Sequence, residues 1–214
     1  MDICYIFGSM EVTDININID KSDIVIAADA GLKNLQSKGL SPDYIVGDFD
    51  SLGFIPDGMN IIKHPVKKDE TDLILAIDIG LKKGYKKFLV YGCLGGRLDH
   101  TFASIQTGAY IAENGGNAVF IDGKTHVSVI KNSTISFSKE SEGIVSVFSL
   151  TDKSSKVNIS NLMYELNDAD LTNKYPLGVS NEFIGKAGRI SVDNGTLCVI
   201  WNGNSTWKFG GKND

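Results

Sequence analysis

Two aspartates near residue 50 have the type and spacing of ligands for a hard metal ion. Asp48 and Asp50 lie in the segment Gly-Asp-Phe-Asp-Ser, directly after the apolar run Tyr44–Val46. Side chains two residues apart on an extended chain point the same way, so both carboxylates can reach one cation. Mg²⁺ commonly takes one or two carboxylates and completes its shell with water and substrate phosphates. The pair therefore indicates a magnesium site, with an Asx-turn carrying two solvated aspartates as the plainer interpretation.

A second acidic segment, residues 67–72, precedes apolar residues at the four-residue spacing of a helix face. These residues are Leu73, Ile77 and Leu81. Asp69 can cap the predicted helix, and Asp72 can lie in its first turn. Capping explains one of these acids but not the whole cluster. Lys68 beside them can hold phosphate oxygens or can simply be solvated.

Residues 92–100 form a glycine-rich segment, Gly-Cys-Leu-Gly-Gly-Arg-Leu-Asp-His, between an apolar run and a helical pattern. Glycine lets backbone N–H groups approach an anion, and a helix N-terminus adds favourable partial charge. Arg97 offers a planar fork suited to phosphate. Asp99 and His100 can also be a helix cap and a surface histidine. The segment has neither the Gly-Lys-Ser/Thr ending of a Walker loop nor the Gly-x-Gly-x-x-Gly dinucleotide fingerprint.

Two more polar turns follow apolar runs in the first half of the chain. Gly8-Ser9 comes after Ile3–Phe7, and Asp29-Ala30-Gly31 comes after Ile24–Ala28. Each turn alone is commonplace. A parallel sheet, however, brings the carboxyl ends of its strands to one edge, where open α/β sheets bind their ligands. We therefore expect all these turns to contribute to one site.

The first half alternates short apolar runs, rich in β-branched residues, with helical patterns. The predicted strands are Ile3–Phe7, Ile24–Ala28, Tyr44–Val46, Lys87–Tyr91 and Ala118–Ile121. The predicted helices are Leu32–Lys38, Asp72–Lys83 and Thr101–Glu113, each followed by a glycine within three residues. This alternation predicts an α/β, Rossmann-like fold: a mainly parallel sheet with flanking helices and right-handed crossovers.

The pattern changes near residue 126 to short alternating runs separated by polar turns. These predicted strands are His126–Lys131, Thr134–Phe137, Ile144–Leu150, Lys156–Ile159, Arg189–Val192 and Thr196–Trp201. Asp193-Asn194-Gly195 predicts a hairpin, because Asn-Gly tolerates the positive φ of a type I′ turn. The second half is therefore predicted to be an antiparallel β-sandwich. We place the two domains at residues 1–125 and 126–214.

Composition and charge narrow the class of protein. The net charge of −5 gives no general attraction to nucleic acid or to an anionic membrane surface, so neither is expected as a partner. No stretch approaches the ~20 apolar residues of a membrane span. The apolar start is short and lacks a basic flank, which is typical of a first strand and not of a signal peptide. Three widely spaced cysteines, Cys4, Cys93 and Cys198, favour free thiols in a cytoplasmic protein.

Taken together, these segments resemble the thiamine pyrophosphokinase (thiamine diphosphokinase) family. The matching segments occur in family order: Asp29–Gly31, Pro42–Ser51, Lys68–Asp72, Gly95–His100 and Gly178–Phe183. They span most of the chain, including its second half. Ala30 departs from the family pattern, which more often has a second glycine at that position.

The resemblance implies an α/β nucleotide-binding catalytic domain followed by a thiamine-binding β-sandwich. It also implies a homodimer, with thiamine in a cleft between the α/β domain of one subunit and the sandwich of the other. The reaction would convert ATP and thiamine to AMP and thiamine diphosphate. As an ATP-dependent diphosphotransferase of this kind, the enzyme would use Mg²⁺ as its cofactor.

The resemblance also implies roles for individual residues. Asp48, Asp50 and Asp72 are expected to hold Mg²⁺, with Asp99 either completing that shell or accepting the substrate hydroxyl proton. The expected ATP-binding residues are Gly8, Ser9, Asp29, Lys68, Gly95, Gly96, Arg97 and His100. The expected thiamine-binding residues are Ser180, Asn181 and Phe183. For Phe183, stacking on the pyrimidine and packing in the sandwich core are both open.

Two other functions fit parts of the sequence. One is an Asp-x-Asp phosphohydrolase acting on a small phosphorylated metabolite, although in that class the motif normally follows the first strand. The other is a non-catalytic nucleotide or thiamine sensor, which would be expected to lack the acidic residues retained here. An assay that detects AMP separates the kinase from both.

Overall fold

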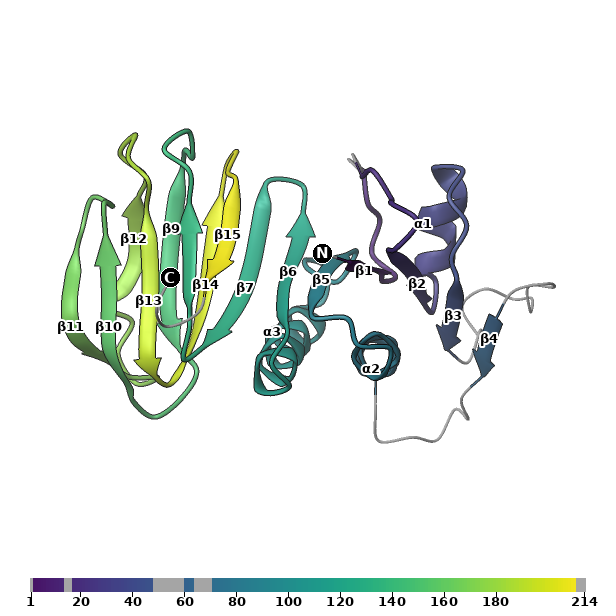
Figure 1. Cartoon of the computed structure of the whole chain (residues 1–214), viewed down its shortest axis with the longest axis horizontal. Coiled ribbons are helices and arrows are strands. Elements are labelled where there is room, and N and C mark those ends of the chain that lie inside the picture. The colour runs from purple at the N-terminus through teal and green to yellow at the C-terminus, as the bar shows by residue number, and fades with distance from the viewer. Residues whose placement is uncertain (1, 14–16, 48–59, 64–70, 211–214) are drawn as a thin grey trace. The chain divides into compact units, whose positions relative to one another are not determined.

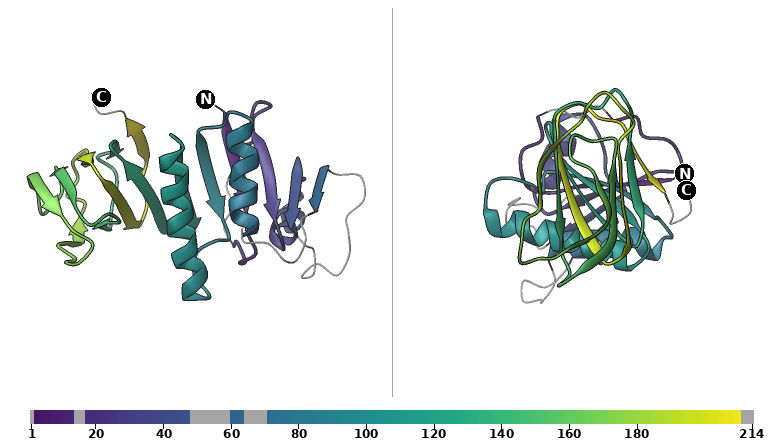
Figure 2. Two further views of the ribbon diagram at one scale, coloured as in Figure 1. Left: turned by 90° about the horizontal axis from the view of Figure 1, so that it is seen from below. Right: turned by 90° about the vertical axis from the view of Figure 1, so that its left-hand side faces the viewer.

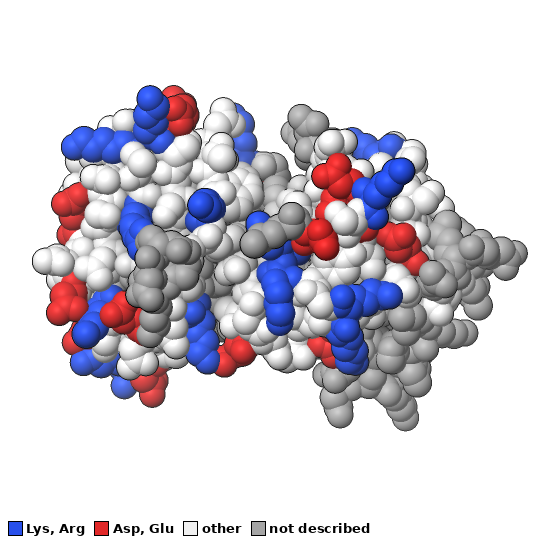
Figure 3. All heavy atoms as spheres, in the orientation of Figure 1, with Lys and Arg blue, Asp and Glu red and all other residues white. Residues whose placement is uncertain are grey.

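The computed structural model describes residues 2–13, 17–47, 60–63 and 71–210. They belong to two compact units, Met1–Gly123 and Lys124–Asp214 (Figure 1). Within the described ranges, none of the helices is long and apolar enough to cross a membrane. On the face drawn in Figure 3, acidic and basic side chains are interspersed over the surface of each unit.

The described part of the first unit is built on a parallel sheet with the strand order β4-β3-β2-β1-β5-β6. Every neighbouring pair in this order is parallel. The strands are β1 (Ile3–Phe7), β2 (Ile24–Ala28), β3 (Tyr44–Gly47), β4 (Asn60–Lys63), β5 (Lys87–Tyr91) and β6 (Asn117–Asp122). The sequence did not predict β4, whose four residues contain only two apolar ones. The other five strands are confirmed within one residue.

Helices cover both faces of this sheet. They are α1 (Gly31–Ser37), α2 (Asp72–Lys82) and α3 (Leu98–Glu113). Leu32 and Leu35 of α1 pack with Tyr5 and Phe7. Gly80 of α2 lies against Cys4 and Phe88, where an added Cβ would come within 2.9 Å and 2.6 Å of their side chains. Alternate residues of a strand face opposite sides, so α1 and α2 cover opposite faces, and α3 lies beside α2 (Figure 2).

The ends of the helices confirm part of the prediction and correct part of it. The glycines after α1 and α2 have φ values of +68° at Gly39 and +92° at Gly84, as expected of C-terminal glycines. Asp69 as the cap of α2 is wrong: Thr71 holds the cap position in an extended conformation, and its Oγ1 accepts from Ile74 N–H at 3.3 Å. Helix α3 begins at Leu98, three residues earlier than predicted, so Asp99 lies inside its first turn.

The second unit consists of antiparallel strands in two groups, β12-β9-β14-β7 and β11-β10-β13-β8-β15. The strands are β7 (Thr125–Lys131), β8 (Thr134–Phe137), β9 (Ile144–Ser149), β10 (Ser154–Ser160), β11 (Leu166–Leu171), β12 (Gly178–Glu182), β13 (Arg189–Asn194), β14 (Thr196–Asn202) and β15 (Trp207–Gly210). The described strands are thus parallel in the first unit and antiparallel in the second. A mainly parallel sheet therefore describes the first unit alone.

The hairpin predicted at Asp193-Asn194-Gly195 is wrong. Strand β13 pairs with β8 and β10, whereas β14 pairs with β7 and β9, so the chain changes sheets at this turn. Gly195 has a φ of +134° and passes so close to Ser154 that a Cβ would lie 2.5 Å from its Oγ. Its N–H donates to Asn132 Oδ1 at 2.9 Å. The local sequence favours a hairpin, but contacts with distant residues decide the path of the chain at this turn.

Candidate functional site

The carboxyl ends of four parallel strands are in register at one edge of the first unit. Phe7 at the end of β1 lies opposite Ala27 of β2 and Tyr91 of β5, and Ala28 lies opposite Val46 of β3. The turns that follow β1, β2 and β5 consequently meet there, as the sequence predicts. We call the turns 8–10, 29–31 and 92–97 the carboxyl edge.

These turns are packed against one another at backbone distance. Gly8 N–H donates to Tyr91 O at 2.7 Å, and Met10 N–H donates to Gly92 O at 3.0 Å. A Cβ on Gly8 would lie 2.6 Å from Gly92 O, and one on Gly31 would lie 1.8 Å from Phe7 O. Gly8 and Gly31 are thus required by close packing, before any ligand is considered.

Ser9 and Asp29 face each other across this edge. Ser9 Oγ donates to Asp29 Oδ2 at 3.2 Å. Asp29 has a φ of +51°, and its N–H donates to Val46 O at 2.7 Å, which fixes the turn after β2 to β3. Ala30 has a φ of −66° in the right-handed region. An alanine is therefore accommodated without backbone strain where the family more often has glycine.

The Gly95-Gly96 turn is exposed and is fastened to the start of α3. Both glycines have left-handed backbone conformations, with φ of +77° and +61°. Thr101 Oγ1 donates to Gly95 O at 3.2 Å, and Ser104 Oγ donates to Cys93 O at 2.7 Å. The turn is held in place from the helix while its own backbone stays accessible, which suits an anion-binding segment.

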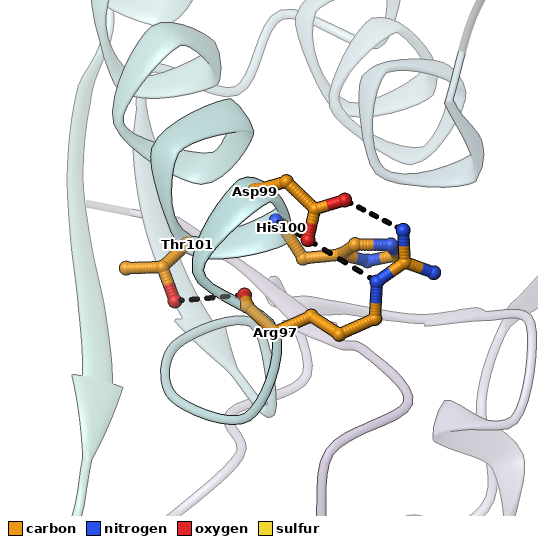
Figure 4. Close-up of polar contacts among 4 residues, drawn as sticks. All are labelled: Arg97, Asp99, His100 and Thr101. Carbon is orange, nitrogen blue, oxygen red and sulfur yellow. Dashed lines mark hydrogen bonds and ion pairs between the residues drawn. The ribbon is translucent and has the colours of Figure 1, made fainter.

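Arg97 and Asp99 bind each other at the N-terminus of α3 (Figure 4). Arg97 Nε donates to Asp99 Oδ1 at 3.1 Å, and Nη2 donates to Oδ2 at 2.6 Å. The hydrogen bond from Arg97 lowers the pKa of the Asp99 carboxyl, and the same bond raises the pKa of Arg97. His100 donates its backbone N–H to Asp99 Oδ1 at 3.1 Å, and its side chain is exposed.

The predicted metal ligands are only partly visible. Asp72 is half-buried in the first turn of α2, and Asp99 lies in the first turn of α3. Asp48, Asp50 and Lys68 lie outside the described residues. Among the residues that are described, no three His, Cys, Asp or Glu side chains gather closely enough to hold a metal ion. The oxygen donors are nonetheless all carboxylates, the ligand type that a hard divalent cation takes.

The three predicted thiamine-binding residues have different surroundings in the second unit. Ser180 is exposed on β12 with a φ of +58°. Asn181 is buried, and its Oδ1 accepts from Tyr164 N–H and Glu182 N–H, both at 2.9 Å, while Nδ2 donates to Tyr164 O at 2.6 Å. Asn181 is therefore engaged mainly in holding the chain at Tyr164.

Phe183 is half-buried and packs edge-on against Phe137, with ring centroids 5.0 Å apart. This contact favours the core role for Phe183 over a free stacking platform. The sequence did not single out Asn34 of α1, which binds the backbone of the carboxyl edge. An asparagine inside a short helical pattern carries no sequence signal of such a contact.

A cavity of about 390 Å³ lies at the opposite end of the β1 and β5 strands from the carboxyl edge. It is lined by Asp2 and residues 83–87. None of the predicted site residues that the structure describes borders it. The carboxyl edge, which gathers polar turns from three strands, remains the candidate site of the first unit.

Comparisons with known proteins identify the family. Residues 16–120 match the model of the thiamin pyrophosphokinase catalytic domain, and residues 132–197 match that of the thiamin pyrophosphokinase vitamin B1 binding domain. The thiamine pyrophosphokinase of Bacillus subtilis (strain 168) is 27% identical over 197 residues, which cover 88% of this chain and 92% of that protein.

Solved structures agree with this result. The crystal structure of thiamine pyrophosphokinase from Bacillus subtilis has a TM-score of 0.83 at 24% identity, covering 95% of this chain and 100% of that one. A probable thiamine pyrophosphokinase from Staphylococcus saprophyticus has a TM-score of 0.68 at 25% identity, with the same coverage. The first of these likenesses shows the fold, and the two matching domain models extend over both units. This chain belongs to the thiamine pyrophosphokinase family.

Proposed function

We propose that this protein is a thiamine diphosphokinase, which transfers the pyrophosphoryl group of ATP to the hydroxyl of thiamine and gives thiamine diphosphate and AMP. The observation that carries the proposal is the match of both domain models, catalytic and vitamin B1 binding, in one chain. The carboxyl edge supports it, because it combines accessible glycine turns, a helix N-terminus and an arginine fork, all suited to phosphate.

The protein contributes to this transfer mainly by binding and aligning the substrates, because phosphoryl transfer needs little covalent help from the protein. Arg97 and the backbone N–H groups of Gly95 and Gly96 hold the polyphosphate. The turn Gly8-Ser9 and Asp29 lie beside the nucleotide. Lys68 and His100 are further ATP-binding residues in this proposal, and they neutralise charge or position the phosphate chain.

Asp48, Asp50, Asp72 and Asp99 would hold the divalent metal ion, which we propose to be Mg²⁺. The set fits the ion chemically, since all four are hard oxygen donors and magnesium sites use few of them at a time. A bound Mg²⁺ supplies neutralisation of the phosphate charge that develops in the reaction. Asp48 directly follows β3, whose end is in register with that of β2, so its position in the chain agrees with this role.

We also propose that Asp99 acts on a proton. The hydrogen bond from Arg97 lowers the pKa of Asp99 and keeps the carboxylate ionised. Once Arg97 binds phosphate instead, that pKa rises and Asp99 can accept the proton of the attacking hydroxyl. The two roles proposed for Asp99 are therefore metal ligand and general base. Both roles need the carboxylate, whereas an amide would support neither.

We propose that thiamine binds next to the exposed Ser180. Asn181 and Phe183 would support this binding segment through their contacts with Tyr164 and Phe137. A homodimer with the active site at its subunit interface is part of the proposal. Large apolar side chains support it, because they are exposed on both units: Leu98 is 81% and Phe102 is 60% exposed, and Tyr164 is 67% exposed. Three free cysteines support a cytoplasmic enzyme.

The decisive experiment incubates the protein with ATP, Mg²⁺ and thiamine and separates the products by chromatography. Thiamine diphosphate and AMP in equal amounts are expected. Formation of ADP would refute pyrophosphoryl transfer. Release of inorganic phosphate from small phosphorylated metabolites, without AMP, would favour the Asp-x-Asp phosphohydrolase instead.

A further inference from the structure

Asn34 ties one turn of the carboxyl edge to helix α1. Its side chain is nearly buried, with 8% of the residue exposed. Nδ2 donates to Gly8 O at 2.9 Å and to Met10 O at 2.7 Å, and Oδ1 accepts from Val12 N–H at 3.1 Å. One side chain therefore binds three backbone groups within residues 8–12.

The chemistry of these three contacts selects asparagine. The backbone offers two acceptors and one donor, and a carboxamide supplies two donors and one acceptor. Aspartate has no donor for the two carbonyls, and leucine has no polar group at all. The orientation of the amide follows from the same contacts, because the reverse orientation would place its oxygen against two carbonyl oxygens.

The same segment is held from its other side by β5. Gly8 N–H donates to Tyr91 O at 2.7 Å, and Met10 N–H donates to Gly92 O at 3.0 Å. Ser9 lies between these anchored residues, is exposed, and donates to Asp29 Oδ2 at 3.2 Å. Asn34 and β5 thus fix the backbone on both sides of Ser9 while its side chain stays at the carboxyl edge.

We propose that Asn34 is a positioning residue for nucleotide binding, which holds residues 8–12 in the conformation that presents Ser9 to the nucleotide. Asn34 acts through the segment and does not itself touch the ligand. The inference rests on the proposed function in taking ATP as that ligand. Preorganising the segment avoids an ordering cost that binding would otherwise have to meet.

The test uses Asn34→Leu, which keeps the branched shape with a larger volume and removes all three contacts, and Asn34→Asp, which keeps only the acceptor for Val12. Leu35→Val, a substitution in the buried apolar face of the same helix, is the matched control. Three quantities are measured: KM for ATP and for thiamine, the ATP dissociation constant with Mg²⁺ and without thiamine, and hydrogen exchange at Met10 and Val12.

We expect KM and Kd for ATP to rise about tenfold in both Asn34 variants, since the segment must be ordered on binding. KM for thiamine should stay within about twofold of wild type, as for a site that the change does not reach. Exchange at Val12 should accelerate in Asn34→Leu and less so in Asn34→Asp. Leu35→Val should leave both ATP constants unchanged.

Several results would overturn the proposal. One is an unchanged KM and Kd for ATP in a folded variant whose Val12 amide has lost protection. Another is a fall in kcat alone, or the same weakening of ATP binding in Leu35→Val, since either would indicate general loosening. If neither variant folds, exchange in the wild type decides: the Met10 and Val12 amides should be protected before ATP is added, and rapid exchange at Val12 in the free protein refutes the role.

Failure of the proposed function has a different outcome. A wild type that binds ATP but forms no thiamine diphosphate refutes the proposed reaction, and weaker ATP binding in the Asn34 variants would still support the positioning role. A wild type that binds no ATP overturns both.

Discussion

The guanidinium of Arg97 lies fork to fork on the carboxylate of Asp99, with donor–acceptor distances of 3.1 Å and 2.6 Å (Figure 4). Both side chains are well exposed, at 73% and 63%. A phosphate presents a guanidinium with the same pair of oxygen acceptors as a carboxylate. A nucleotide phosphate that binds the guanidinium of Arg97 would therefore displace the carboxylate of Asp99. The displaced carboxylate would then be free for another role.

Arg97→Ala should weaken ATP binding. Hydrogen bonds to charged groups contribute about 1.5–3 kcal/mol, so KM for ATP should rise roughly 10- to 100-fold. Arg97→Lys keeps the charge without the fork and should lie in between. The measurement is AMP release at varied ATP. Arg189→Lys, a change on β13 of the second unit, is the control, and an unchanged KM in Arg97→Ala would remove Arg97 from the phosphate site.

The pKa of Asp99 should respond to its partner. The hydrogen bond from Arg97 holds this pKa below the ordinary aspartate range, so Arg97→Ala should raise it. Carboxyl chemical shifts followed by NMR across an acid titration measure the change. ATP added to the wild type should raise the Asp99 pKa as well if phosphate takes the guanidinium. A pKa that stays low in Arg97→Ala would mean that the helix N-terminus, and not Arg97, stabilises the carboxylate.

Asp50→Asn should leave the fold intact and lower turnover by about 10²-fold or more, since a metal carboxylate that contributes several kcal/mol becomes a neutral amide. AMP release at saturating ATP and thiamine measures kcat, and thermal melting checks the fold. Glu140→Gln, which removes an exposed acidic side chain of the second unit, is the control and should have the kcat of the wild type. Near-normal turnover of Asp50→Asn would exclude Asp50 from the metal site.

The sequence predicts an element well where the element's own residues determine it, and poorly where contacts with distant residues do. Buried strands such as β2, with all five residues buried, carry enough apolar sequence to be recognised. Strands β11, β12 and β15 were missed, and each lies at the edge of its group, where few side chains must be apolar. The turn at Gly195 misled the prediction because contacts with Ser154 and Asn132, distant in sequence, decide its path.

The candidate site also has features that the sequence predicts and features that it does not. The meeting of Ser9 and Asp29 at one edge was predictable, because parallel strands align their ends. The pairing of Arg97 with Asp99 was not, since the sequence equally allows each to face solvent. The role of Asn34 depends on a contact with residues more than twenty positions away, for which a single sequence gives no signal.

Asn181→Ala should destabilise the second unit. The change removes the hydrogen bonds to Tyr164 N–H, Tyr164 O and Glu182 N–H, and each such bond contributes about 0.5–1.5 kcal/mol. Urea unfolding should show this loss, whereas Ser180→Ala at the neighbouring exposed position should change stability by less than about 0.5 kcal/mol. If Asn181→Ala raises KM for thiamine with stability unchanged, Asn181 contacts the substrate directly.

His126 should make the second unit sensitive to acid. Its ring is nearly buried and stacks on Trp201, with centroids 5.2 Å apart and 5° between the planes, and a second tryptophan, Trp207, lies 5.1 Å away. Nδ1 lies 3.1 Å from Lys124 O and therefore carries the proton of the neutral ring. Burial lowers the pKa of His126 below its ordinary value of 6.5.

The sign of the effect follows from proton linkage. Below pH 6.5 the unfolded chain binds a proton that the folded chain resists, so stability is full above that pH and falls as the pH drops toward the folded pKa, by at most about 1.4 kcal/mol per pH unit. Unfolding followed by tryptophan fluorescence between pH 5 and 8 measures it. His126→Phe should lose this component, and His100→Asn should retain it. A wild type that is more acid-resistant than His126→Phe would mean that the face of Trp201 stabilises the imidazolium by more than burial disfavours it.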